Sequence, residues 1–154
     1  MSWSKWILSV FLIIPSSWTR VSRLNHAIET AEKSYAETKY EESVANHMVL
    51  VSEFEYKSPE LSFDLGLSHQ YAEKVDEAQT WYDQATQSPN KMLVSFALNQ
   101  GGVIIGNKKE YEAALSKFQS ALIKDPTNEQ ARYNYEMLAR WLQRDEERKN
   151  QDQN

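Results

Sequence analysis

The sequence predicts an all-α protein in which pairs of antiparallel helices stack into an α-solenoid. Three observations predict this fold: a set of small and aromatic residues appears twice at one spacing, helix-forming sequence lies between these marks, and the intervening turns are short. Gly66 and Gly102, for example, are 36 residues apart. A fixed period of this size indicates a helical repeat array rather than a compact domain with one core.

Small residues occupy the positions where two helices of a repeat must approach each other closely. A glycine in the first helix admits the second helix, because a larger side chain would hold the two backbones apart. In the second helix, two alanines and one aromatic ring share a face at i, i+4 and i+7, so the ring fills the space beside the alanines. The residues assigned to this packing, including a closing proline, are Gly66, Ala78, Tyr82, Ala85, Gly102, Ala114, Phe118, Ala121 and Pro126.

These marks resemble the tetratricopeptide repeat (TPR). Pro126 closes the best copy, which contains the run 110–115, and Pro89 closes the middle copy one place early. The resemblance covers residues 24–141. It implies a TPR-type α-solenoid of about three helix pairs plus a C-terminal capping helix, preceded by a short apolar N-terminal segment.

The repeat register divides the domain, residues 22–142, into units. They are expected at 24–58, 59–90 and 91–126, with the capping helix at 128–142. The first unit is a degraded copy, in which Ala31 holds the small position and His47 replaces the aromatic residue. In the third unit, Gly106-Asn107-Lys108 is expected to form the turn, with Gly106 and Asn107 supplying left-handed backbone geometry. Residues 143–154 are polar throughout, which predicts a disordered tail.

Residues 1–21 differ in character from the rest of the chain. Lys5 adds a positive charge beside the amino terminus, and the apolar run from Trp6 to Ile14 then ends at Pro15. This run is too short to cross a bilayer as a helix, which needs about 20 residues. Its shape is that of a secretory signal, so we expect a signal peptide or membrane anchor and a place in the cell envelope, periplasmic or membrane-associated. The alternative is an extra helix buried against the first unit.

Composition and motifs argue against several other classes of protein. The net charge of −5 over 154 residues argues against nucleic-acid binding, and the absence of cysteine excludes thiolate metal sites. His26, His47 and His69 lack the spacing of metal ligands. The glycine-rich segment 101–108 lacks a lysine where a phosphate-binding loop requires it, because Asn107 lies there. We therefore predict no enzyme activity, no cofactor and no metal.

In TPR proteins the first helix of each pair lines the concave face, which the resemblance makes the expected partner-binding face here. Aromatic rings with amides between them suit an extended peptide. In register, this face carries Phe63, Gln70, Tyr71, Phe96, Asn99, Asn107, Tyr133 and Arg140. We expect Tyr71 and Phe96 on one strip at the junction of units two and three. The alternative is that residues of this face, such as Leu67, Val103 and Met137, only pack helix on helix.

TPR co-chaperones that clamp a C-terminal carboxylate use lysine, asparagine and arginine on their first helices. In register, those positions hold Ile28, Glu32, Asp64, Phe96 and Gln100. Every basic position is missing and two acids lie there, so the sequence argues against carboxylate capture. It favours a neutral or basic partner segment.

The order of parts is similar to that of TPR proteins of bacterial aerotolerance (Bat) operons. An apolar leader and the repeats are followed by the segment 125–136, which contains Ala-Arg-Tyr-Asn-Tyr-Glu, and then by a polar tail rich in glutamine. This resemblance implies envelope partners in the membrane and a role in oxygen tolerance. The leading hypothesis is a non-enzymatic scaffold that binds a protein or peptide partner. The alternative is a structural subunit that self-associates through the ends of its solenoid.

Overall fold

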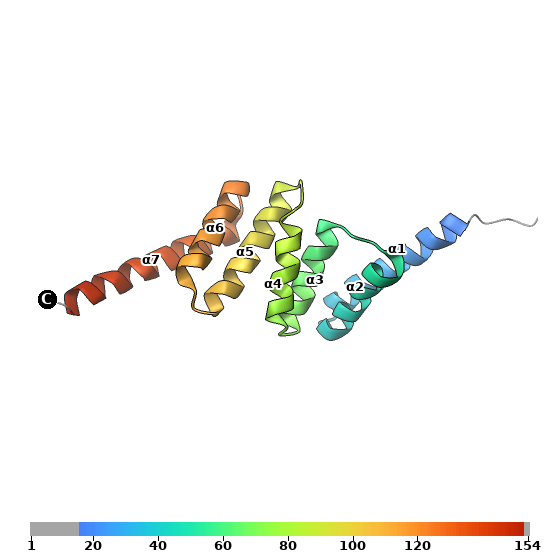
Figure 1. The fold of residues 1–154 in the computed structure, drawn as a ribbon, viewed down its shortest axis with the longest axis horizontal. Helices are drawn as coiled ribbons and strands as arrows, with labels where there is room; N and C mark the ends of the chain where they lie inside the picture. The colour runs from blue at the N-terminus through green and yellow to red at the C-terminus, as the bar shows by residue number, and fades with distance from the viewer. Residues whose placement is uncertain (1–15, 153–154) are drawn as a thin grey trace, which may run out of the picture.

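The computed structural model describes residues 16–152, which form seven α-helices in a single row and no strand (Figure 1). The helices are α1 (Ser16–Ala36), α2 (Tyr40–Phe54), α3 (Pro59–Tyr71), α4 (Val75–Ala85), α5 (Lys91–Asn107), α6 (Tyr111–Lys124) and α7 (Glu129–Asp152). The most extensive contacts join α1 to α2, α3 to α4 and α5 to α6, and α7 covers α6. The predicted α-solenoid of three helix pairs and a C-terminal helix is confirmed.

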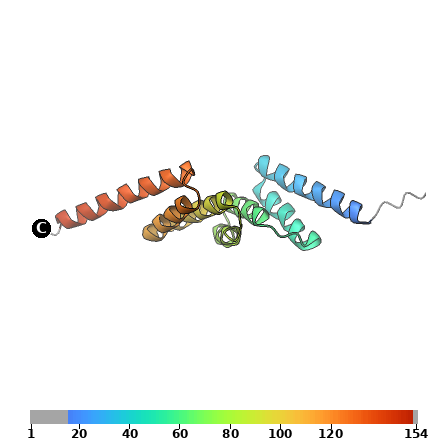
Figure 2. The same ribbon diagram turned by 90° about the horizontal axis from the view of Figure 1, so that it is seen from above.

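The first helices of the pairs form one side of the row. In Figure 2, α1 (blue) and α7 (red) lie on the upper side, and α4 (yellow-green) lies on the lower side. Along the upper side α3 contacts α5, and α5 contacts α7. We call the exposed surface of α1, α3, α5 and α7 the first-helix face, and that of α2, α4 and α6 the second-helix face.

The turn inside each pair has one geometry in all three units. Each contains a non-glycine residue with a left-handed backbone: Thr38 (φ 60°), Glu73 (φ 61°) and Lys109 (φ 66°). In the second unit, the amide that follows this residue, on Lys74, donates to the His69 carbonyl at 2.8 Å. In the other two turns, the Lys39 amide donates to the Ser34 carbonyl and the Glu110 amide donates to the Ile105 carbonyl. Each of the three turns is therefore a Schellman motif.

This geometry corrects the turn expected in the third unit. Helix α5 continues through Asn107, and the left-handed residue is Lys109. Gly106 has an ordinary helical backbone and lies opposite Ala114, whose Cβ would be 3.5 Å from a Cβ at residue 106. Gly106 therefore belongs to helix α5 and not to the turn, and its position leaves room for a Cβ.

Between the helices, the repeat positions hold the core. The four alanines of the second helices and Tyr82 are fully buried, and Phe118 is nearly so. In the first unit, Ser43, His47 and Leu50 occupy the equivalent positions of α2 and are buried as well, as is Ala31 at the small position of α1. Pro126 lies in the turn before α7, where its carbonyl accepts a hydrogen bond from Arg132.

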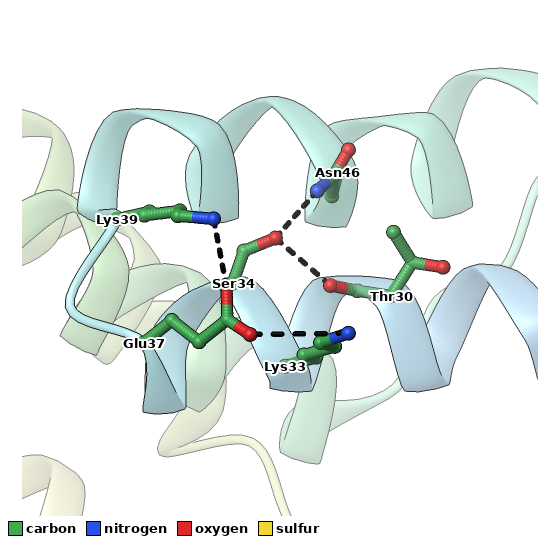
Figure 3. A network of polar contacts seen from close by, with 6 residues as sticks. All are labelled: Thr30, Lys33, Ser34, Glu37, Lys39 and Asn46. Carbon is green, nitrogen blue, oxygen red and sulfur yellow. Dashed lines mark hydrogen bonds and ion pairs between the residues drawn. The ribbon is translucent and has the colours of Figure 1, made fainter.

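Polar contacts hold the two helices of the first unit together. Ser34 of α1 accepts a hydrogen bond from Asn46 Nδ2 of α2 at 2.7 Å and donates to the Thr30 carbonyl at 2.9 Å (Figure 3). Below it, Glu37 pairs with Lys39 at 2.8 Å and with Lys33 at 3.8 Å. Because Ser34 and Asn46 are partly shielded from water, this bond fixes α1 against α2 where the first repeat has weak sequence marks.

Both ends of the array differ from the expected boundaries. Helix α1 begins at Ser16, so residues 16–21 belong to this helix, whereas residues 1–15 of the expected leader lie outside the described residues. Helix α7 continues to Asp152, well past Leu142, where we expected the capping helix to end and a disordered tail to begin. Ion pairs along the helix stabilise this extension, such as Asp145 to Lys149 at 2.7 Å. Within residues 16–152, no helix combines the length and apolar character needed to span a membrane.

Candidate partner-binding surface

Three of the eight residues expected on the partner-binding face support helix packing. The Phe63 ring lies 5.7 Å from the Tyr82 ring, centroid to centroid. The Gln70 side-chain oxygen accepts a hydrogen bond from the Tyr82 hydroxyl at 2.6 Å. Asn99 is 2 % exposed, and its side-chain oxygen accepts from Asn134 at 2.9 Å. These side chains hold helices in place and offer little surface to a partner.

Tyr71 is 51 % exposed and belongs to a group of rings that we call the tyrosine cluster, Tyr35, Tyr40 and Tyr71. The Tyr71 ring stacks on Tyr40, with centroids 5.0 Å apart and an interplanar angle of 22°. It meets Tyr35 edge-on at 6.0 Å, and the Tyr35 and Tyr40 rings are 5.6 Å apart. The cluster joins α1, α2 and α3.

The expected strip of Tyr71 and Phe96 is therefore a wrong prediction. Tyr71 ends α3 and faces the turn of the first unit, whereas Phe96 lies in the second turn of α5 and is half-buried. Since α3 and α5 are both first helices of their pairs, the two rings lie near opposite ends of these helices. The rings that Tyr71 does meet belong to units one and two.

Carboxylates lie beside the tyrosine cluster. Burial and, to a smaller extent, the negative charges of Glu32 and Glu60 raise the pKa of Asp64 to about 6. Burial also raises the pKa of Tyr35 to about 12, with smaller contributions from Tyr71, Tyr40 and Asp64. Within residues 16–152, no ion pair reaches Asp64, Glu32 or Glu60. This part of the first-helix face is acidic and aromatic.

The other end of the same face carries two arginines beside exposed apolar side chains. Tyr133, which is 67 % exposed, and Met137 line a hollow on α7 together with Arg140 and Arg144. The Arg140 guanidinium bonds to the Glu136 carboxylate at 3.2 Å and to its carbonyl at 3.1 Å. A second hollow, between α5 and α7, is lined by Asn99, Gln100, Val103, Glu129, Gln130, Tyr133 and Asn134. Asn107 is exposed at the end of α5.

The sequence reasoning did not find Tyr35 and Tyr40 as surface residues. A signal was present, because Tyr40 and Tyr111 both begin a second helix and hold the same repeat position. The Tyr111 ring packs on Trp141 of α7 at 4.6 Å, much as Tyr40 packs on Tyr71. A ring at this position contacts a ring on the following first helix, at both ends of the array.

Two of the histidines are packing residues. His47 is buried, and its Nδ1 lies 2.9 Å from the Ser43 carbonyl and 3.2 Å from the Ser43 hydroxyl. His69 is buried with neither ring nitrogen hydrogen-bonded. Burial lowers the pKa of both imidazoles and favours their neutral form. In the described part of the chain, no three His, Asp or Glu side chains are grouped so that they could hold a metal ion.

Among known proteins, no family model and no curated protein matches this sequence. Solved structures do match. The Sgt2 TPR domain from Aspergillus fumigatus is 12 % identical and superposes with a TM-score of 0.69 over 81 % of this chain and 82 % of that one. The first TPR of Spaghetti (RPAP3) bound to the HSP90 peptide SRMEEVD is 15 % identical, with a TM-score of 0.65 over 79 % of this chain and 94 % of that one.

The second TPR domain of human RPAP3, in complex with the HSP70 peptide SGPTIEEVD, is 16 % identical. It superposes with a TM-score of 0.64 over 78 % of this chain and 98 % of that one. At such identities the similarity concerns the fold, and the closer likeness to proteins of Bat operons stays a prediction from sequence. The chain has the fold of the TPR domains.

Proposed function

We propose that this protein is a non-enzymatic scaffold that holds a protein or peptide partner on its first-helix face. The observation that carries this proposal is the set of large exposed side chains on that face, with Tyr71 on α3 and both Tyr133 and Met137 on α7. Exposed rings beside charged groups are typical anchors for a partner, because they bury a large area at a small entropy cost. TPR domains of the same fold hold peptides in solved structures.

The partner differs in charge from the peptides bound by those domains. Their peptides end in Glu-Glu-Val-Asp, which places several negative charges at one end. Glu32 and Asp64 lie on the first-helix face of this chain without a paired cation among residues 16–152, so they would repel such an end. A neutral or basic segment suits this part of the face.

For the location, we propose the bacterial cell envelope, through the apolar leader and the likeness to TPR proteins of Bat operons. Trp18 and Val21, both exposed on α1, follow the apolar run closely in the sequence and support attachment near a membrane surface. A role in oxygen tolerance would follow from the same likeness. Fractionation of producing cells tests the location: full-length protein free in the cytoplasm would contradict it.

Self-association through the solenoid ends is the second candidate. It is favoured by the partly exposed Trp141, whose ring packs on Tyr111 of α6 at the C-terminal end of the array. Light scattering of the purified protein over a range of concentrations separates the two candidates. A monomer at every concentration supports the scaffold, and a stable oligomer supports the assembly subunit.

The scaffold is tested by isolating the protein with its cross-linked partners from solubilised membranes. We expect Tyr133→Ala to lose the partner, because a buried aromatic anchor contributes on the order of 1–3 kcal/mol to a complex. Its thermal midpoint should change little, since Tyr133 is mostly exposed. Ile123→Ala is the matched control, because Ile123 is 73 % exposed on α6 of the second-helix face. Retention of the partner by Tyr133→Ala, or equal loss in both variants, would contradict the proposal.

A further inference from the structure

The tyrosine cluster presents an aromatic surface at the junction of the first two units. Tyr35 and Tyr40 are half-buried and hold the Tyr71 ring by edge and stacking contacts, while half of Tyr71 remains open to solvent. Because its neighbours fix this ring, little side-chain entropy remains to be lost when a partner covers it. A rigid, half-exposed ring is a ready contact for a flat or cationic group.

Three carboxylates accompany the tyrosine cluster on the same face. Glu60, Asp64 and Tyr71 share one side of α3, because they are four and seven residues apart along the helix. Glu32 of α1 is close enough to Asp64 to act on its charge, and Asp64 in turn acts on Tyr35. Asp64, Glu32 and the rings therefore form one surface, and Glu60 lies at its edge near the N-terminal end of α3.

No cation of the chain compensates these acids within residues 16–152. The lysines nearest to Glu32 along the chain, Lys33 and Lys39, both pair with Glu37 at the end of α1. Lys57, the lysine nearest to Glu60 and Asp64 along the chain, is not among the charges that act on Asp64. The charged groups that act on Asp64 are Glu32 and Glu60, and both are negative. A free carboxylate that is half-buried among like charges is unfavourable on its own, so a cation from outside would stabilise it.

We propose that the tyrosine cluster, Asp64 and Glu32 bind an arginine-bearing segment of the partner. The proposal rests on the scaffold function above and names the chemistry of the partner at units one and two. The guanidinium group fits this surface in two ways: its planar face stacks on a tyrosine ring, and its N–H groups donate in pairs to a carboxylate. Lysine offers only a point charge, so arginine should be preferred.

A second copy of this chain is the competing occupant, because α7 carries Arg140 and Arg144 on its exposed face. Arg140 already pairs with Glu136 of its own helix, and Arg144 donates a hydrogen bond to the Arg140 carbonyl. If Arg140 bound the acids of another copy, its pair with Glu136 would break, and Glu136 would be left without a cation. An arginine on a separate partner segment meets no such cost, and we favour it.

The test is a titration of the full chain, in a neutral detergent, with a labelled peptide of alternating arginine and glycine. A second peptide carries citrulline in place of each arginine, which keeps the shape and removes the charge. We expect the arginine peptide to bind, and the citrulline peptide to bind at least about tenfold more weakly. Asp64→Asn and Tyr71→Ala should each weaken binding of the arginine peptide by about threefold or more.

The matched control is Glu77→Gln, which makes the same change in net charge at an exposed position on α4, outside the first-helix face. If Glu77→Gln weakens binding as much as Asp64→Asn does, the peptide responds to overall charge and the proposal fails. It also fails if the two peptides bind equally. Unfolding midpoints accompany each titration, and binding lost by Asp64→Asn without loss of stability identifies the carboxylate as a binding group.

Two further outcomes separate this proposal from the scaffold itself. If the arginine peptide does not bind but Tyr133→Ala still loses the natural partner, the scaffold holds and this inference is overturned. If light scattering shows a dimer that both Asp64→Asn and Arg140→Gln abolish, the occupant is a second copy, which also overturns it. The inference is supported if the arginine peptide binds, if Asp64→Asn and Tyr71→Ala each weaken this binding, and if Glu77→Gln does not.

Discussion

The Tyr82 ring lies so close to the backbone of Gly66 that a methyl group at residue 66 would be 2.6 Å from two ring carbons. One period later, a methyl group at Gly102 would be 2.6 Å and 2.8 Å from ring carbons of Phe118. The Tyr82 ring has no room to retreat, because it is fully buried and its hydroxyl donates to Gln70. The first contact sets the distance between α3 and α4, and the second sets the distance between α5 and α6.

Gly66→Ala should therefore destabilise the protein. The added methyl group forces the ring or the backbone to move, which typically costs about 1–3 kcal/mol in a packed core. Chemical denaturation measures the loss. Gly106→Ala is the control, because a Cβ there meets Ala114 at an ordinary 3.5 Å, and alanine is favoured over glycine in a helix by about 0.5–1 kcal/mol. Equal effects of the two substitutions would show that close approach at Gly66 does not matter.

Glu73→Gly should stabilise the protein, even though it removes a side chain. Glu73 has a left-handed backbone with φ 61°, which costs a non-glycine residue about 1–2 kcal/mol. Glycine removes this strain but gains freedom in the unfolded chain, so we expect a net gain of about 0.5 kcal/mol. The adjacent Ala72 has φ −81°, and Ala72→Gly should lose stability in the same denaturation assay. A loss for both variants would contradict the strain at Glu73.

His69→Ile should also stabilise the protein, because both nitrogens of the buried imidazole lack a hydrogen bond. Ile105 holds the equivalent place before the turn of the third unit, so the fold already accepts isoleucine there. We expect a gain of about 1 kcal/mol at neutral pH. A loss of stability would indicate that the imidazole has a partner, such as an ordered water.

The gain from His69→Ile should grow as the pH falls. Burial lowers the pKa of His69 in the folded protein below its ordinary value of 6.5. As the pH falls below 6.5, the unfolded state takes up a proton at this imidazole before the folded state does. The wild type therefore loses stability, and the isoleucine variant does not. Denaturation at two values, one above pH 7 and one near pH 5, measures this difference. An unchanged gain would contradict the lowered pKa.

Asp64→Asn should produce the opposite pH dependence. The folded pKa of Asp64, about 6, lies above the ordinary 3.8, so between these values the folded state holds the extra proton. The free energy of unfolding of the wild type therefore falls as the pH rises through this window. The asparagine side chain of the variant stays neutral, so we expect the variant to be more stable than the wild type above pH 6 and to lose this advantage near pH 4. A variant that is less stable at pH 7 would show that the carboxylate is favourably placed.

The sequence alone predicted the parts of the fold that the repeat period controls. Spacing located Gly66, Tyr82, Gly102 and Phe118, because close helix packing restricts the residue types at these positions. The register also assigned His47 to the position that Tyr82 and Phe118 hold in the other units, although the first unit has no aromatic residue there. Its ring is buried like the equivalent rings, although it is much more polar.

Features with no fixed residue type were missed. The left-handed turn residues are Thr38, Glu73 and Lys109, and none is a glycine that would mark the turn. The end of α7 looked like a disordered tail, because its stability comes from pairs such as Asp145 and Lys149 and not from apolar residues. Tyr71 meets Tyr35 and Tyr40 because the end of α3 lies beside the turn between α1 and α2. A repeat period does not specify this contact between units.

Site-specific photo-cross-linking in producing cells tests the use of the first-helix face most directly. A photoreactive phenylalanine analogue replaces Tyr133 on α7, Tyr71 on α3 or, as a control, Ile123 on α6, and all three positions are largely exposed. A scaffold that binds its partner on the first-helix face should give the same cross-linked species from residues 133 and 71 and none from residue 123. Cross-links from residue 123 alone, or from all three positions equally, would contradict it.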